Sequence, residues 1–227
     1  MITNDVWGRV FRLRFGQSEG TGVAIDLDGK QYLATARHVV SQLASGGTIE
    51  IMRHETWHKV VVTAVTHAQG DVDVSLIAVP QILSAPHLKL APSMDGLIYG
   101  RDVYFLGYPY GMYGSIGAND GWPLAFVKRA TLSGISDPKT QGELMLYLDG
   151  HNNPGFSGGP VVFHHGHELR LAGIVSGFQA KQEPVYMGDQ ASPLSYQYNT
   201  GIMIAWGSPV VTELARQNGA GFATNGY

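Results

Sequence analysis

Short apolar runs, separated by glycine, proline and polar turns, follow one another along most of the chain. In many of them polar and apolar side chains alternate with a period of two, which is typical of half-buried β-strands. In the first half the pattern predicts six strands, near residues 9–15, 23–27, 30–35, 48–52, 59–66 and 71–79. In the second half it predicts six more, near residues 102–106, 124–135, 143–148, 160–163, 169–177 and 201–205. We therefore expect an all-β chain in which each group of strands forms a small barrel.

Two segments depart from this pattern. Residues 80–100 are richer in proline and show no strong period, so we expect them to link two domains. The boundaries expected on this basis are 1–90 for an amino-terminal barrel and 91–227 for a carboxy-terminal one. Residues 208–217 place apolar side chains at helical spacing and predict a terminal amphipathic helix, followed by a flexible tail.

Composition narrows the function classes. The chain has 227 residues, of which 44% are hydrophobic and 15% charged, so it can bury a substantial core. A formal net charge of −3 offers no basic surface for nucleic acid, and no apolar run approaches the length of a membrane span. Neither nucleic acid nor a membrane is therefore expected as a partner. The sequence gives no indication of the oligomeric state.

The absence of cysteine excludes disulfides, thiolate metal sites and a thiol nucleophile. The first residues show neither a basic start nor an apolar signal core. A cytoplasmic location is therefore the default expectation. A mature domain excised from a longer protein has the same appearance, and that alternative stays open.

The most informative stretch for chemistry is 153–162, which reads NPGFSGGPVV. Ser157 lies there among three glycines, directly before an apolar strand. Glycines let the backbone approach other groups closely and reach dihedral angles that side chains forbid. Acyl transfer needs such a turn, because it requires an exposed hydroxyl and backbone N–H groups directed at the developing oxyanion. The alternative is an ordinary glycine-rich turn that happens to contain serine.

A serine hydroxyl needs an adjacent base, usually a histidine oriented by a carboxylate. Of the nine histidines, His38 follows an apolar strand and opens a short helical turn, which fixes its backbone. Asp73 stands at the entry of an apolar strand and is the preferred carboxylate. Asp71 is a weaker candidate in a more loop-like position, and either could be an ordinary turn aspartate. Three further histidines crowd a hairpin tip and are expected to be solvated rather than to bind a metal; these are His164, His165 and His167.

Three segments together carry a family resemblance. Residues 34–39 (ATARHV), 73–77 (DVSLI) and 153–161 (NPGFSGGPV) resemble the motifs of the trypsin/chymotrypsin-like serine peptidases. The likeness is greatest to the cysteine-free bacterial branch with the HtrA-type and glutamyl peptidases. The motifs come in the family's order, His, Asp and Ser, with separations of 35 and 84 residues.

This resemblance implies two perpendicular six-stranded β-barrels with the site in the cleft between them. It implies a serine endopeptidase that cleaves protein or peptide substrates and needs neither cofactor nor metal. The implied triad is His38, Asp73 and Ser157, and the implied oxyanion hole consists of the N–H groups of Gly155 and Ser157. His38 would take the serine proton and Asp73 would hold the imidazole.

Residues that shape specificity follow from the same resemblance. Ser176, Gly177 and Phe178 resemble the strand that pairs with substrate backbone and forms one wall of the specificity pocket. Gly201 resembles part of the opposite wall, and His151 falls near the pocket floor. Since no carboxylate lies there, cleavage after lysine or arginine is disfavoured. A small or apolar residue at the cleavage point is expected because Phe178 could fill part of the pocket, and an acidic residue that uses His151 is the rival. His151 could equally be an ordinary loop residue.

The chain departs from the family pattern at Phe156, where the digestive enzymes carry an aspartate that pairs with a freed N-terminal amine. A phenyl ring cannot make that ion pair, so activation of that type is not expected. Arg37 beside the histidine and Ser75 in the aspartate motif are departures that look tolerable.

Two other function classes share parts of this pattern. Residues 155–159 also match the G-x-S-x-G elbow of α/β-hydrolases, but that fold needs an acid and then a histidine after the serine. Here every acidic residue after Ser157 also follows the last histidine, His167, so the order fails. The second alternative is a catalytically silent or partner-gated member of the same fold that acts as a peptide-binding module.

Overall fold

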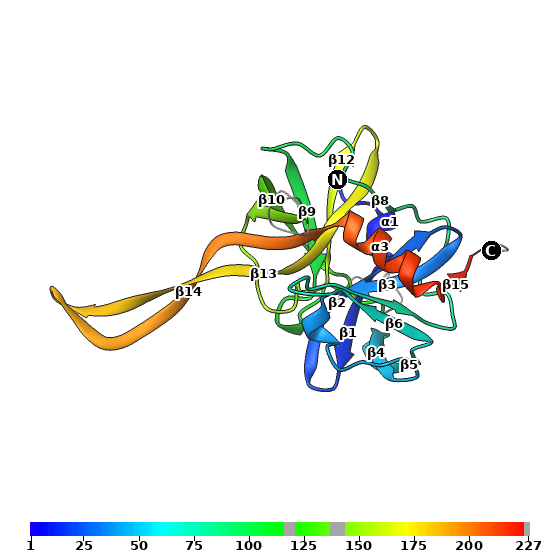
Figure 1. Cartoon of the computed structure of the whole chain (residues 1–227), viewed down its shortest axis with the longest axis horizontal. Coiled ribbons are helices and arrows are strands. Elements are labelled where there is room, and N and C mark those ends of the chain that lie inside the picture. The colour runs from blue at the N-terminus through cyan, green and yellow to red at the C-terminus, as the bar shows by residue number, and fades with distance from the viewer. Residues whose placement is uncertain (116–120, 137–143, 225–227) are drawn as a thin grey trace.

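The structure is a computed structural model that describes residues 1–115, 121–136 and 144–224. Its body consists of two sheets that are antiparallel except where β8 pairs with β13, and a long two-stranded ribbon projects from one side of it (Figure 1). The predicted all-β fold with two barrel-forming sheets and a terminal helix is confirmed.

The first sheet contains eight strands in the described part of the chain. Their spatial order is β5 (Thr56–Val61), β4 (Thr48–Arg53), β1 (Val10–Phe15), β2 (Ser18–Leu27), β3 (Lys30–Thr35), β7 (Ser75–Ala78) and β6 (Ala64–His67). The eighth strand, β15 (Phe222–Ala223), pairs with β3 from the far end of the chain. A short helix α1 (Asn4–Trp7) precedes β1, and a 3₁₀ turn η1 (Arg37–Val39) follows β3.

The second sheet contains seven strands in the described residues. Their order is β12 (Pro160–His165), β9 (Asp102–Gly107), β10 (Phe126–Ile135), β11 (Met145–Asp149), β14 (Gln190–Gly207), β13 (Glu168–Met187) and β8 (Ala91–Pro92). Because β12 also pairs with β13, the six longer strands close into a ring. The 3₁₀ turn η2 (Pro109–Gly111) follows β9, and helix α3 (Ser208–Asn218) follows β14.

The sheets differ from the predicted counts for identifiable reasons. The run predicted as one strand at 59–66 is two strands, β5 and β6. Strand β8 lies in the segment expected to be a linker, and β15 lies in the expected tail. Both are two residues long, too short to show a period of two. The first residue of the strand predicted at 143–148 lies outside the described residues.

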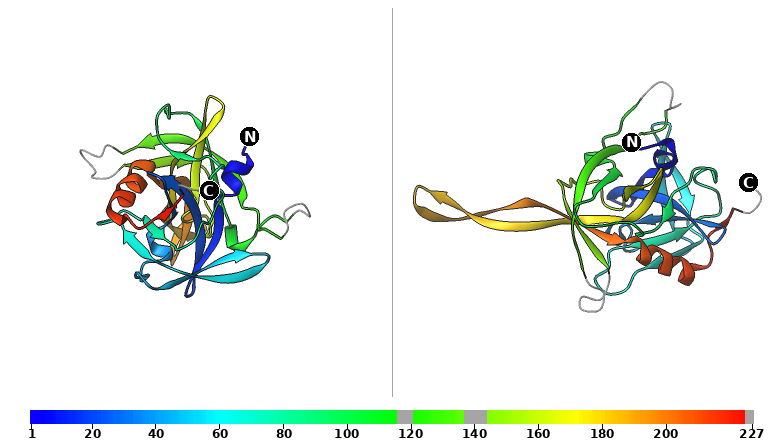
Figure 2. Two further views of the ribbon diagram at one scale, coloured as in Figure 1. Left: turned by 90° about the vertical axis from the view of Figure 1, so that its right-hand side faces the viewer. Right: turned by 90° about the horizontal axis from the view of Figure 1, so that it is seen from above.

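The ribbon was not predicted. Strands β13 and β14 were expected to span 169–177 and 201–205, but they continue as a paired hairpin to a turn at Gly188, whose φ is 62°. Figure 2 shows the two strands side by side and clear of the body in a view at right angles to Figure 1. We call residues 179–200 the arm.

Three apolar clusters form the core. One lies within each barrel, and the third includes residues of both sheets and of α3. Arg9, the first residue of the strand predicted at 9–15, is buried despite its charge. Its guanidinium donates to the carbonyl of Leu88 and pairs with the carboxylate of Asp26, which compensates its charge.

Candidate active site

His38 and Asp73 meet because of strand register. The last paired residues of β3 and β7 are Thr35 and Ser75, so the residues just beyond them lie next to each other. The backbone N–H of His38 donates to Asp73 Oδ1 at 2.8 Å, and His38 Nδ1 lies 2.7 Å from Asp73 Oδ2. Since an ionised carboxylate only accepts, Nδ1 carries the proton and Nε2 of the neutral ring is left as an acceptor. Asp71 is exposed and makes no hydrogen bond to His38.

Asp73 is held by a third donor. The Ser176 hydroxyl donates to Asp73 Oδ2 at 2.6 Å. Burial alone would raise the pKa of Asp73, but the hydrogen bonds from His38 and Ser176 outweigh it and hold that pKa below its usual value. The carboxylate therefore stays charged at neutral pH and keeps its acceptors directed at the imidazole. Sequence reasoning placed Ser176 only in a substrate-binding wall and missed this second contact.

The turn before Ser157 has a defined conformation. The Phe156 N–H donates to the Asn153 carbonyl at 3.3 Å, which closes a four-residue turn with Pro154 and Gly155 in the middle. Proline fixes φ of the first central residue, and Gly155 has φ = 104° in the second, the combination of a type II turn. A Cβ on Gly155 would lie 2.1 Å from the Tyr108 carbonyl oxygen, so no larger residue fits.

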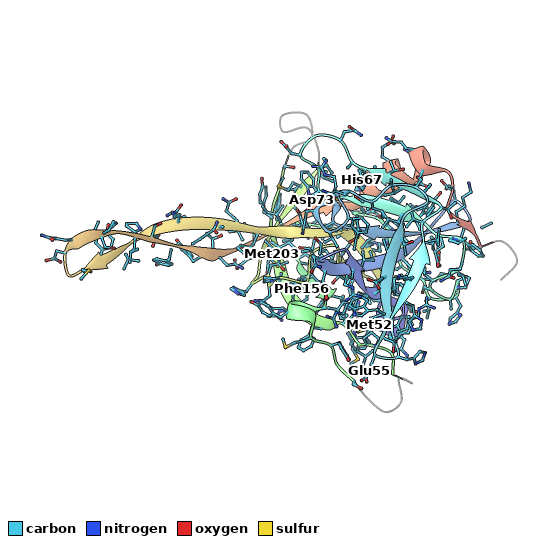
Figure 3. All side chains as sticks on the ribbon, turned by 90° about the horizontal axis from the view of Figure 1, so that it is seen from below. Met52, Glu55, His67, Asp73, Phe156 and Met203 are labelled. Atoms are coloured by element: carbon cyan, nitrogen blue, oxygen red, sulfur yellow. The ribbon has the colours of Figure 1, made fainter. Side chains whose placement is uncertain are left out.

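Both sheets hold this turn in place. Thr21 of β2 donates its hydroxyl to the Gly155 carbonyl at 2.7 Å and its backbone N–H to the Ser157 carbonyl at 2.8 Å. From the second barrel, the fully buried Phe156 packs edge-on against Phe105, with ring centroids 4.9 Å apart. Phe156 therefore serves as an apolar anchor for the turn in place of the absent aspartate ion pair. Figure 3 shows Asp73 and Phe156 on the side of the body from which the arm leaves.

The hydroxyl of Ser157 donates to the backbone carbonyl of Ser176 at 3.1 Å. In the described structure no hydrogen bond joins it to His38, whose Nδ1 contacts Asp73. Ser176 thus links the two groups, because its side chain binds Asp73 and its carbonyl binds the serine hydroxyl. The N–H groups of Gly155 and Ser157 have no backbone acceptor in the described part of the chain, so they are available to a ligand.

The structure gives the residues expected to set specificity different surroundings. A cavity of about 500 Å³ includes Gly201 but none of the other expected residues; its lining is Ser133, Gly134, Tyr147, Leu148, Asp149, Thr200, Gly201 and Ile202. Gly177 faces open space, and Phe178 pairs with Met203 at the base of the arm. His151 is exposed.

Lys128 of β10 was not singled out from the sequence. Its ammonium donates to the carbonyl of His151 and to Asn153 Oδ1, the latter at 3.1 Å, and lies 5.8 Å from the ring centre of Phe156. Burial lowers the pKa of this lysine. Nothing in the alternation of β10 distinguishes it from the neighbouring Arg129. Lys128 therefore braces the loop that precedes the serine.

The comparison with protein families decides the class. The family model of the trypsin-like peptidase domain matches residues 20–174, about two thirds of the chain. The chain belongs to the trypsin-like peptidase family. This trypsin-like serine peptidase is accordingly a hydrolase whose substrates are proteins or peptides. A comparison with curated protein sequences found no significant match.

Solved structures support the same fold. The active form of the Rv3671c protease from M. tuberculosis is 20% identical with a TM-score of 0.60, over 97% of this chain and 87% of that one. The HtrA-type protease AlgW, solved with a tripeptide, is 19% identical with a TM-score of 0.61, over 94% of this chain and 61% of that one. A serine endoprotease from Yersinia pestis is 17% identical with a TM-score of 0.58, over 94% and 64%. At these identities the likeness concerns the fold alone.

The described residues contain neither a helix that could span a membrane nor a cluster of metal ligands. No helix among the described residues combines the length and the apolar character that crossing a bilayer requires. Within the same residues no three histidine or acidic side chains gather as a metal site would need, and this includes the histidines at 164, 165 and 167.

Proposed function

We propose that the trypsin-like peptidase is a serine endopeptidase in which Ser157 is the nucleophile, His38 the general base and Asp73 the residue that orients it. The observation that carries the proposal is the contact of His38 Nδ1 with Asp73 at 2.7 Å, which leaves Nε2 free to accept a proton. The type II turn that presents Ser157 between two sheets supports it.

In this mechanism the Ser157 hydroxyl turns from the Ser176 carbonyl to His38 Nε2. As its oxygen attacks the substrate carbonyl, the hydroxyl proton passes to Nε2, and the imidazolium is stabilised by the charge of Asp73. Collapse of the tetrahedral intermediate breaks the C–N bond, and the proton on Nε2 goes to the leaving amine. Water then gives a proton to the same nitrogen and attacks the acyl-enzyme, which releases the acid and regenerates the serine.

We assign the oxyanion hole to the N–H groups of Gly155 and Ser157. Neither has a backbone acceptor in the described structure, and the turn that carries them is fixed by Pro154 and by the contacts of Thr21. Donors held in place before reaction need no reorganisation as charge develops on the substrate oxygen.

For specificity we keep a small or apolar residue at the cleavage point, with Phe178 in the wall, as the first expectation. The rival acidic preference through His151 gains one observation, because the ammonium of Lys128 lies at the His151 carbonyl. Cleavage profiling with a peptide library separates the two, and strong cutting after lysine or arginine would overturn both.

A fluorophosphonate probe tests the proposal, because it reacts covalently only with an activated serine. We expect the parent protein to be labelled, Ser157→Ala to be silent and Asp73→Asn to lose labelling by on the order of 10⁴-fold. Asp71→Asn is the matched control and is expected to keep the parental rate, since Asp71 does not contact His38.

The alternative is a silent or partner-gated binding module. The bond from the Ser157 hydroxyl to the Ser176 carbonyl favours it, since in that state the serine is not activated. Failure of the parent protein to label under any condition, while it still binds peptides, would establish this alternative.

A further inference from the structure

The arm gives the trypsin-like peptidase a sheet edge that no other strand covers. Strand β12 pairs with β13 only as far as Ile174, and β8 pairs with it only at Arg170 and Leu171. Val175 still makes two backbone hydrogen bonds on this side, since its carbonyl accepts from the Gly158 N–H and its N–H donates to the Gly159 carbonyl. From Ser176 outward, β13 is paired on the β14 side alone within the described chain. Its opposite side presents unpaired backbone N–H and C=O groups.

The arm is a built structure that lacks a core. A ribbon of two strands is at best marginally stable in water, and a third strand normally stabilises it. The Tyr198 hydroxyl of β14 donates across the ribbon to Glu183 of β13 at 2.9 Å, and along β14 itself the rings of Tyr196 and Tyr198 lie 5.9 Å apart. At its base the Asn199 side chain donates to the carbonyl of Asn152 at 2.8 Å. The ribbon is therefore held in a defined direction with one edge unused.

That edge begins at the reacting serine. The carbonyl of Ser176, its first residue, accepts the Ser157 hydroxyl at 3.1 Å, so a substrate carbonyl at Ser157 lies beside the start of the edge. From Ser176 to Glu183 the edge is about 24 Å long at ~3.4 Å per residue. Pro184 has no N–H and interrupts any ladder there. The Gln179 carbonyl already accepts the Thr200 hydroxyl at 2.7 Å, so the usable part of the arm edge is Ala180–Glu183.

We propose that the edge of the arm lengthens the backbone-pairing strand expected at Ser176–Phe178, and so binds substrate residues farther to the amino-terminal side of the cleaved bond. The inference rests on the proposed function and names its substrate class: unfolded polypeptides with a long extended segment before the cleavage point. A segment antiparallel to β13 runs inward along the arm and reaches Ser157 with its carbonyl end, which is the direction that acyl transfer requires. Main-chain pairing of this kind gives affinity with little demand on sequence.

The side chains near the tip agree with a polypeptide ligand. Four large apolar residues of the arm are strongly exposed: Tyr186 at 62%, Met187 at 76%, Leu194 at 67% and Tyr196 at 50%. Side chains of this kind gain most from apolar groups that unfolded chains expose and folded chains bury. A second copy of the chain could use the same edge, but it would cover the approach to Ser157, whereas a substrate has to lie there.

The test compares two synthetic peptides with the same cleavage sequence, taken from library profiling of the parent protein. One has about three residues before the cleaved bond, and the other has about seven more, enough to reach Glu183. We expect kcat/KM to be higher for the long peptide by about tenfold, the size of two or three net hydrogen bonds. In a variant that joins Ala180 to Asn199 through an Asn-Gly turn, the ratio should fall to about one while the short peptide is cleaved at the parental rate.

Point variants separate the edge from the fold of the arm. Gln182 and Gln197 are directly opposite each other, as are Lys181 and Tyr198, and successive residues direct their backbone groups to opposite edges. In one of these two pairs the N–H groups point outward, so proline there leaves the ribbon ladder intact. In that pair, we expect the proline variant on β13 to cleave the long and the short peptide with equal kcat/KM. The proline variant on β14 should keep the higher kcat/KM for the long peptide.

The outcomes are distinct. A ratio near one in the parent protein, or a ratio that persists after the arm is shortened, overturns the extended site while the short peptide and the probe still report an enzyme. A dimer in light scattering that depends on the arm assigns the edge to a second copy and also overturns it. If the short peptide is not cleaved and the probe does not label, the proposed function fails and the inference fails with it.

Discussion

The anchoring role of Phe156 leads to a quantitative prediction. Its side chain is fully buried in the carboxy-terminal barrel, where it contacts Phe105, and its backbone is part of the turn that presents Ser157. Truncation of a buried phenylalanine to alanine costs about 3–5 kcal/mol of the free energy of unfolding. For a chain of this length we expect the melting temperature of Phe156→Ala to fall by about 6–20 °C.

A second variant separates the anchor from the general effect of a cavity. Phe163 of β12 is also fully buried and belongs to the same apolar cluster, but it lies outside the turn. Phe163→Ala should lose a similar free energy of unfolding. At a temperature where both variants are folded, Phe156→Ala should react with a fluorophosphonate roughly 10–100-fold more slowly than Phe163→Ala. The reason is that even a small displacement of the nucleophile lowers the rate of attack.

Thermal unfolding monitored by circular dichroism gives the stability of each variant. Quenched time courses with the fluorophosphonate give the rate at which Ser157 is labelled. A stability loss below about 1 kcal/mol in Phe156→Ala would show that the ring does not carry the packing we assign to it. Equal labelling rates in the two alanine variants would show that the ring stabilises the barrel without positioning the serine.

Three further predictions follow from the same structure. Gly158 has φ = 85°, and a Cβ there would lie 2.0 Å from a backbone oxygen, so Gly158→Ala should lower the free energy of unfolding by more than about 4 kcal/mol in a urea titration. The control is Gly46→Ala, because Gly46 has φ = 83° and open space around it. This control should lower the same quantity by only about 1 kcal/mol. The lowered pKa of Asp73 contributes stability that is present above about pH 4 and lost as the pH falls below it, so Asp73→Asn should flatten the acid side of the stability profile, and unchanged slopes would contradict this. Lys128→Met should slow probe labelling severalfold by releasing the loop before the serine, whereas Arg129→Met, on an exposed neighbour, should label like the parent; equal rates would remove the bracing role.

Sequence reasoning was most successful where strands pack on a core. Alternation in β1 reflects burial of one face, whereas β3 is a largely apolar run that is buried on both faces, so the positions of both strands were predictable. The arm was not predictable in this way because it has no buried face. Its strands mix glutamine, serine, proline and tyrosine without a period, and only its closing Gly188-Asp189 is a recognisable hairpin turn.

The site shows a similar division. The glycines around Ser157 are visible in the sequence as a tight turn. The structure explains why they are glycines, because a Cβ at these positions would collide with backbone atoms. The direction of the Ser157 hydroxyl could not, because it depends on a rotamer and on the carbonyl of Ser176, which is brought near by tertiary folding. The loop-bracing contacts of Lys128 likewise join residues more than twenty positions apart, a separation on which local patterns carry no information.

The pairing of β15 with β3 has a consequence for biosynthesis. Phe222 is hydrogen-bonded in register with Gln31, and Asn218 at the end of α3 donates to Thr66 of β6. A ribosome adds about 5–20 residues per second, so the nascent amino-terminal half waits about seven to thirty seconds for these partners. During that interval Lys30 and Gln31 of β3 lack the second strand that pairs with them in the complete fold. Emergence of residues 218–223, rather than emergence of the first barrel, therefore marks the moment at which the first sheet becomes complete.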